Sequence, residues 1–268
     1  MSEEGTAEGP APNAPPIEPP PGAAFPGVDG PAESTGDEPL NRVATAIRRI
    51  SALAVGLPVA QEVVADAAAR LTALADELEA AAPPVKVMRQ KPVPSGHPQD
   101  FFPTSPMTGF ANPIAPPVEV WAVVGADGRR EVRGRATFDY QHEGPPTCVH
   151  GGVIAELFDE ILGLANLVVG EGSMTGTLTV RYRRPTPLLT PLELAARCTG
   201  REGRKVFTWG GIYDQGVLTA EAEGIFVHVG PDRMLEIVTG NANKSEAPLV
   251  DEGWQRIVTR NRVGGHEG

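Results

Sequence analysis

Two cysteines, few aromatic residues and no long apolar run set the first limits on this chain. Aromatic residues fill only 5% of its 268 positions. Cys148 and Cys198 are too few for a disulfide framework and suit a reducing compartment. No stretch reaches the roughly 18 apolar residues of a membrane span, and the start, MSEEGTAEGP, lacks the basic and apolar parts of a signal peptide. We therefore expect a cytoplasmic protein with no membrane span.

Positive charge is also scarce, and it is absent from the first 40 residues. The whole chain carries −11 at pH 7, and eight of its acids fall in residues 1–40, so the remainder is close to −3. This balance argues against nonspecific nucleic-acid binding, which needs a basic face. Because residues 1–40 are rich in Pro, Gly, Ala and Glu, we predict that they form a disordered tail.

Residues 41–95 begin with a helical pattern. Apolar residues recur every three or four positions on both sides of a Gly-Leu-Pro break at Gly56–Pro58, which predicts a helical pair followed by a linker. Two interpretations of the pair stay open. One is a helix-turn-helix that binds DNA, supported only by Arg48 and Arg49; the other is an arm that packs on the main domain or on a partner.

Residues 96–230 have the pattern of one α+β domain. The predicted strands are 118–124, 131–138, 174–184, 193–200, 205–213 and 218–229, and one helix is predicted at about residues 151–169. Short turns join most of the strands, which makes neighbours antiparallel, so we predict one curved antiparallel sheet wrapped around one long helix. Residues 231–268 have the composition of a polar C-terminal tail.

The predicted helix begins with two glycines, Gly151 and Gly152. The first turn of a helix presents unpaired backbone N–H groups and the positive end of the helix dipole, and glycine lets a ligand approach them closely. Such an end can polarise a carbonyl group or hold an oxyanion. Glycine pairs before helices are often just tight turns, and on the glycines alone this second interpretation is favoured.

Carboxylates follow on the same helix. Periodicity places Glu156, Asp159, Glu160, Gly163 and Asn166 opposite the apolar stripe, as on a solvated face. A sheet that curves around the helix would instead leave Asp159 in a dry groove, where it could act as a general base. Both interpretations stay open on periodicity alone.

Two motifs resemble a known family over about residues 96–230. VHGGVIAELFDEILG (149–163) and MTGTLTVRYRRPTPL (174–188) are similar to the hotdog-fold acyl-CoA thioesterases of the PaaI-like group, especially to its THEM-type branch. The resemblance implies that Asp159, nine residues after His150, is the catalytic carboxylate. It also implies that Thr175 orients the water or the carboxylate, that Gly151 N–H polarises the thioester carbonyl, and that His150 shapes this turn.

The same resemblance extends to assembly and to one departure. It implies a homodimer or a dimer of dimers, with the site completed at the subunit interface and Gly152 among the substrate contacts. Many PaaI-like members carry an Asn where this chain has Gly144, and the THEM-type branch lacks that Asn as well.

An acyl-CoA substrate carries phosphates, so its site needs local positive charge. Two clusters are candidates: Arg181, Arg183 and Arg184, and then Arg201, Arg204 and Lys205. Strand alternation predicts that Arg181 and Arg183 share one face of the sheet. Solvated strand ends are the alternative interpretation of both clusters.

Other chemistries find little support in the sequence. His142, Cys148 and His150 do not have the spacing of a zinc site, and nothing marks Cys148 as a nucleophile. Serine-hydrolase, Walker and Rossmann motifs are missing, and we expect no cofactor and no metal. We expect hydrolysis of acyl-CoA to acid and CoA; a non-catalytic acyl-CoA sensor and a hotdog hydratase stay open, and Asp159 with Thr175 favours the hydrolase.

Overall fold

The computed structural model describes residues 39–56, 58–82, 102–125, 128–170, 172–230, 232–233 and 236–237. The predicted disordered tail over residues 1–38, most of the linker and nearly all of the predicted C-terminal tail lie outside these residues. Helix α1 (Pro39–Gly56) takes in the last two residues of the segment predicted as tail.

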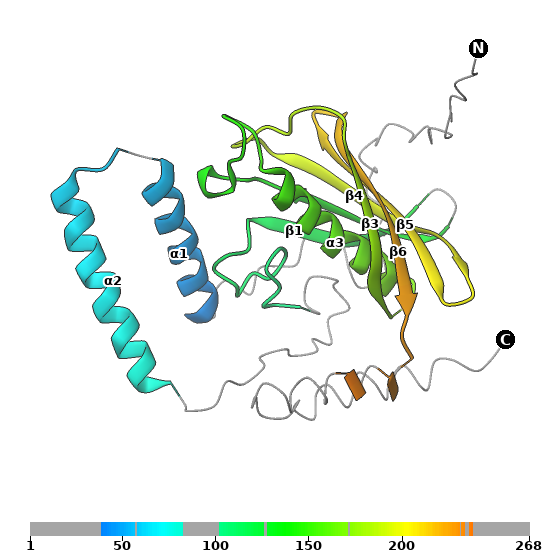
Figure 1. Ribbon diagram of the computed structural model, residues 1–268, viewed down its shortest axis with the longest axis horizontal. Helices are drawn as coiled ribbons and strands as arrows, with labels where there is room; N and C mark the ends of the chain where they lie inside the picture. Colours follow the sequence, from blue (N-terminus) through cyan, green and yellow to red (C-terminus); the bar gives the residue numbers. More distant parts are fainter. Residues whose placement is uncertain are drawn as a thin grey trace, which may run out of the picture.

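Six strands form one antiparallel sheet, in the order β1-β2-β4-β5-β6-β3 (Figure 1). The strands are β1 (Val118–Val124), β2 (Arg130–Ala136), β3 (Ser173–Tyr182), β4 (Leu192–Glu202), β5 (Lys205–Asp214) and β6 (Val217–His228). The predicted strands are confirmed, with ends that differ by no more than two residues. Strand β3 follows the helix in the chain. It comes last in the strand order, beside β6, so it lies at one edge of the sheet.

Tight turns set the register of the sheet where the sequence predicts them. Gln215 and Gly216, between β5 and β6, have φ values of 49° and 78°. Two successive positive φ values are the mark of a type I′ hairpin, whose twist matches that of the strands it joins. This turn holds β5 and β6 in antiparallel register beneath the helix.

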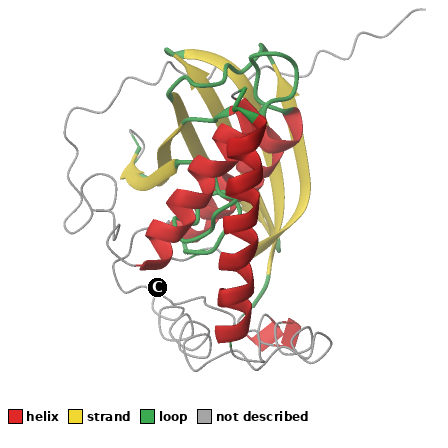
Figure 2. Cartoon of the chain, turned by 90° about the vertical axis from the view of Figure 1, so that its left-hand side faces the viewer, coloured by secondary structure: helices red, strands yellow, loops and turns green. Residues whose placement is uncertain are grey.

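Helix α3 (Gly151–Val168) packs against the sheet, which curves around it (Figures 1 and 2). Leu157, Phe158, Ile161 and Leu162 are completely buried. Burial of each such side chain contributes on the order of 1.5–3 kcal/mol, so this stripe is a main source of stability. The α+β hotdog architecture expected from the sequence is confirmed.

Asn166 corrects one detail of the helical wheel. Periodicity placed it on the polar face, but it is fully buried, and its Nδ2 donates a hydrogen bond to Ser173 Oγ at 3.1 Å. The prediction fails because β3 begins beside the C-terminal end of α3 and covers a face that the helix alone would leave open.

Both predicted helices are present. The first, α1, packs on the main domain, which is the second of the two interpretations given for the pair. Helix α1 contacts the short 3-10 helix η2 (Tyr140–His142), and Arg48 Nη1 donates to the carbonyl of Asn112 at 2.8 Å. Arg48 is therefore engaged by the domain itself, which weakens the DNA-binding interpretation. Helix α2 (Gln61–Ala81) lies beyond α1 and has no buried residue (Figure 1). Among the described helices, none combines the length and the apolar character that crossing a bilayer requires.

Candidate active site

His150 starts α3 by capping it. Its Nδ1 accepts a hydrogen bond from Gly152 N–H at 3.0 Å, which satisfies one of the unpaired donors of the first turn. A Cβ at position 152 would lie only 3.0 Å from that nitrogen, so glycine is what lets the imidazole approach. The predicted role of His150 in shaping the turn fits this geometry, but the Gly152 amide is occupied by the cap and is not available to a substrate.

Gly151 is held from the other side by Tyr182. The Tyr182 hydroxyl donates to the Gly151 carbonyl at 2.8 Å, and a Cβ on Gly151 would meet the Tyr182 ring at an ordinary 3.4 Å. The sequence analysis does not single out Tyr182, because this contact joins residues 31 positions apart in the chain. Tyr182 therefore fixes the peptide of the expected carbonyl-polarising residue from the end of β3.

Gly144 has a steric reason for replacing the Asn of many PaaI-like proteins. A Cβ at this position would lie 2.7 Å from the Cα of His150, a distance that real Cβ atoms do not tolerate. The turn is also closed by Gly144 N–H donating to Cys148 O at 2.9 Å. No side chain at 144 can thus supply a second polar contact in this backbone arrangement.

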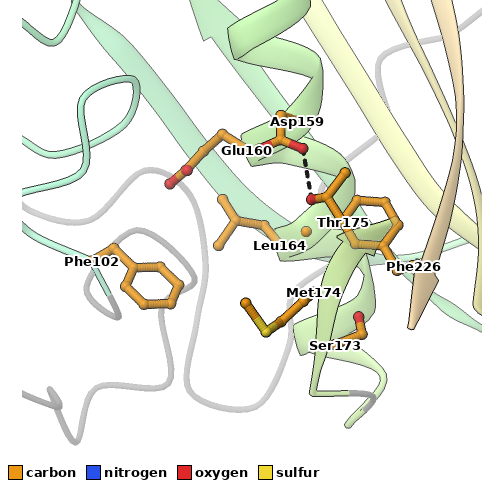
Figure 3. Close-up of a pocket in the computed structure, with 9 residues that line it drawn as sticks. Phe102, Asp159, Glu160, Leu164, Ser173, Met174, Thr175 and Phe226 are labelled. Atoms are coloured by element: carbon orange, nitrogen blue, oxygen red, sulfur yellow. Dashed lines mark hydrogen bonds between the residues drawn. The ribbon is translucent and has the colours of Figure 1, made fainter. Parts of the chain in front are cut away.

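Asp159 and Thr175 lie together, as the resemblance implies. The Thr175 hydroxyl donates to Asp159 Oδ1 at 2.7 Å, which joins the middle of α3 to the start of β3 (Figure 3). A hydrogen bond to a charged acceptor is about twice as strong as one between neutral groups, so it fixes one carboxylate oxygen and leaves the other for a reactant. Both side chains are exposed in the single chain, because β3 is an edge strand. The dry groove expected around Asp159 is therefore not formed by one chain alone.

A cavity of about 360 Å³ opens beside this pair. It is lined by Phe102, Asp159, Glu160, Gly163, Leu164, Ser173, Met174, Thr175 and Phe226 (Figure 3). Apolar side chains dominate away from the carboxylates. The arrangement suits a ligand with one polar, reactive group near Asp159 and an apolar remainder.

The two ends of the predicted catalytic set lie far apart within one chain. Gly151 and Asp159 are eight residues apart on the same helix, which is about 12 Å along its axis. An oxyanion donor must lie about 3 Å from the reacting oxygen, and a base must reach the same reacting centre. One chain therefore cannot bring both groups to a single thioester.

Of the first basic cluster, Arg181 and Arg183 are already paired. Arg183 Nε donates to Glu221 Oε1 at 2.8 Å, and the Glu221 side chain is only 5% exposed. Arg181 Nη1 lies 3.3 Å from Glu223 Oε1. Both partners belong to β6, which confirms that the two arginines share a face of the sheet. Arg183 and Arg184 are both exposed, but the Arg183 guanidinium is already paired with a buried carboxylate.

The second basic cluster lies at the opposite end of the sheet. Lys205 pairs with Val227, which in turn pairs with Met174, so the start of β5 is two strands from the start of β3. Arg204 and Lys205 are exposed there, on the side of the Asp159–Thr175 pair. Arg183 and Arg184 instead follow Tyr182, on the side of Gly151.

Comparisons with known proteins agree with this architecture. The family model described as the thioesterase superfamily matches residues 147–221. A solved thioesterase superfamily protein is 35% identical, with a TM-score of 0.62 over 71% of this chain and 91% of its own. The acyl-coenzyme A thioesterase THEM4 of Xenopus laevis is 38% identical over 91 residues, and that of Mus musculus is 34% identical over 96 residues.

The class defined by the fold and the site is that of hotdog proteins with an acidic residue on the central helix. Within that class, this chain belongs to the thioesterase superfamily. The THEM4 alignments cover 33% and 35% of this chain and 41% of each relative, so the chain matches about two fifths of the length of these curated relatives.

Proposed function

We propose that the protein hydrolyses acyl-CoA thioesters to a free acid and CoA. The observation that carries the proposal is the hydrogen bond between Thr175 and Asp159 at the mouth of an apolar cavity. A protein that only binds acyl-CoA has no use for a carboxylate oriented in this way. The relatives named acyl-coenzyme A thioesterase support the same substrate class.

The site is completed by a second copy of the chain. Because Gly151 and Asp159 of one chain are too far apart to act on one thioester, each active site uses Asp159 of one subunit and Gly151 of the other. Strand β3 is the natural interface, since it is an edge strand and residues 174–177 on it are all exposed. A two-fold axis perpendicular to β3, near the middle of this edge, sets the Thr175 end of one β3 against the Tyr182 end of the other. The minimal unit is therefore a homodimer.

The chemistry then divides between the two subunits. Gly151 N–H, at the positive end of α3, polarises the thioester carbonyl and stabilises the oxyanion. Asp159, held by Thr175, takes a proton from a water molecule whose oxygen attacks the carbonyl carbon. The tetrahedral intermediate collapses, the C–S bond breaks, and the CoA thiolate leaves and is protonated.

Direct attack by Asp159 is the other route that the geometry supports. The carboxylate would then form a mixed anhydride and release the CoA thiolate, and water would hydrolyse the anhydride. Both routes use the same three groups. When water attacks the anhydride at the Asp159 carbonyl carbon, a single turnover in ¹⁸O-labelled water separates the two routes, because an unlabelled Asp159 oxygen then enters the first acid product.

In this proposal, exposed basic residues bind the phosphates of CoA. Arg184 from the Gly151 side, and Arg204 and Lys205 from the Thr175 side, are the candidates. Arg183 is a weaker candidate because of its pairing with Glu221. A dimer about β3 brings the two clusters, one from each subunit, to the same end of the interface.

The test is release of the CoA thiol from a panel of acyl-CoAs by the full chain. Wild type is expected to turn over, Asp159→Asn to lose turnover, and Glu156→Gln to retain it. Glu156 is a matched control because it is another exposed acid on α3, three residues before Asp159. Tight binding of acyl-CoA by wild type without any turnover would contradict the proposal and favour a sensor.

A further inference from the structure

A glycine in the middle of α3 lacks a structural explanation. Gly163 lies one turn after Asp159, on the cavity side of the helix. Glycine is unfavourable inside a helix compared with alanine, so its presence calls for a reason. Close packing is not that reason, because the nearest atom to an added Cβ would be Phe226 Cε1 at 3.9 Å, an ordinary contact. What a side chain at 163 would change is the room inside the cavity.

Phe102 lines the cavity across the opening from Leu164 and Met174 (Figure 3). Phe102 begins a segment, residues 102–116, that precedes the first strand and lies outside the matched thioesterase region. Within this segment, Ser105 N–H donates to Phe102 O at 2.9 Å and Ala111 N–H donates to Pro103 O at 3.0 Å. These bonds make the segment a compact wall that opposes α3.

Two long-range hydrogen bonds hold this wall in position. The hydroxyl of Thr108, which is 2% exposed, donates to Glu160 Oε1 at 2.7 Å and ties the segment to the residue next to Asp159. From the other side, Arg48 of α1 donates to Asn112 O at 2.8 Å. Helix α1 thus holds the wall in place while touching neither Asp159 nor Thr175.

We infer that Gly163 and Phe102 determine which acyl chains the protein accepts, and that Arg48 is a positioning residue for Phe102. Gly163 leaves the passage beyond Asp159 open, so that the apolar chain of the substrate extends past Leu164 and Met174. Phe102 closes the passage and sets its length. The inference rests on the proposed acyl-CoA hydrolysis and adds its selectivity for chain length.

The test is kcat/KM on saturated acyl-CoAs from acetyl upward, measured on the full chain. In wild type, each methylene buried in the cavity should raise kcat/KM by about fourfold until the chain reaches Phe102, after which the rise stops. Gly163→Ala should move this break to shorter chains. Phe102→Ala should move it to longer chains, and Phe102→Leu is the milder variant if the alanine impairs folding.

Arg48→Met should shift the break in the same direction as Phe102→Ala, but by less, with kcat for acetyl-CoA unchanged. Ile114→Ala is the matched control, because Ile114 is in the same segment and 67% exposed, and it should leave the profile as in wild type. A uniform loss at all chain lengths, or an unchanged break in Gly163→Ala and in both Phe102 variants, would overturn the inference while leaving hydrolysis intact. Absence of turnover by wild type on every acyl-CoA would instead overturn the proposed function.

Discussion

Helices α2 and α3 have similar lengths and both carry an apolar stripe, yet they differ completely in burial. Helix α3 buries eight residues and carries the carboxylate of the site, whereas α2 buries none. The difference comes from the sheet, which curves around α3 and leaves α2 uncovered. An apolar period in a sequence therefore identifies a helix, but the elements around it decide whether the helix supports stability and chemistry.

The largest expected effect is on α3, at the carboxylate. Asp159→Asn removes the proposed proton acceptor or nucleophile and should lower kcat by roughly 100- to 10,000-fold, the usual range for general acid–base catalysis. Thermal unfolding should change little, because asparagine has the same shape and its amide oxygen still accepts a hydrogen bond from Thr175. A kcat within a few fold of wild type would contradict the assignment of the catalytic carboxylate to α3.

Because α3 is buried and α2 is not, substitutions in the two helices should differ in their effect on the free energy of unfolding. Ile161→Ala on α3 leaves a cavity in the core and should lower the free energy of unfolding by about 2–5 kcal/mol. Urea denaturation of each variant measures this value directly. If Ile161→Ala costs no more than a surface substitution, α3 is not the core of the fold.

Thr175→Val tests the partner of Asp159 with little change in shape. Loss of a hydrogen bond to a charged group is worth about 1.5–3 kcal/mol, so kcat should fall by roughly 10- to 100-fold. Thr175→Ser, which keeps the hydroxyl, is the control and should retain most of the activity. A larger loss in Thr175→Ser than in Thr175→Val would mean that the methyl group, and not the hydrogen bond, is what matters.

The residues predicted before the structure differ in kind from those missed. Asp159, Thr175 and Gly151 could be found because two local motifs fix their spacing along the chain. Phe102 and Arg48 could not be found, because their roles depend on segments that are distant in the sequence. Phe102 lines the cavity beside α3, and Arg48 donates to the carbonyl of Asn112. Asn166 was misplaced for the same reason, because its burial depends on where β3 begins.

Stability should also depend on pH through His142, which lies under α1 in the η2 turn. His142 is buried against Phe138, with ring centroids 5.5 Å apart, and burial lowers the pKa of its imidazole below the usual value. The unfolded chain therefore binds a proton more readily, so stability falls as the pH drops below about 6.5. Thermal unfolding of wild type and His142→Phe between pH 8 and pH 5 measures this, and the variant should lose less stability on acidification.

The smallest effect is expected on α2. Leu74→Gln replaces a side chain that is 50% exposed, so the free energy of unfolding should change by less than about 0.5 kcal/mol. Urea denaturation beside Ile161→Ala provides the comparison. A loss of several kcal/mol would show that α2 is covered in solution, and the contrast between the two helices would then not hold.

The most direct test of the two-subunit site is complementation between Asp159→Asn and Gly151→Pro. Proline suits the first position of a helix, is compatible with the extended His150 that precedes it (ψ 134°), and replaces the N–H donor with a ring carbon. Gly151→Ala, which keeps the N–H, is its control. Co-expressed, differently tagged chains yield heterodimers with one undamaged site, which should have about half of the wild-type activity. Heterodimers of wild type with the Asp159→Asn/Gly151→Pro double variant should be inactive. Inactive heterodimers of the two single variants, with half-active heterodimers of wild type and double variant, would show that Asp159 and Gly151 of the same chain act together.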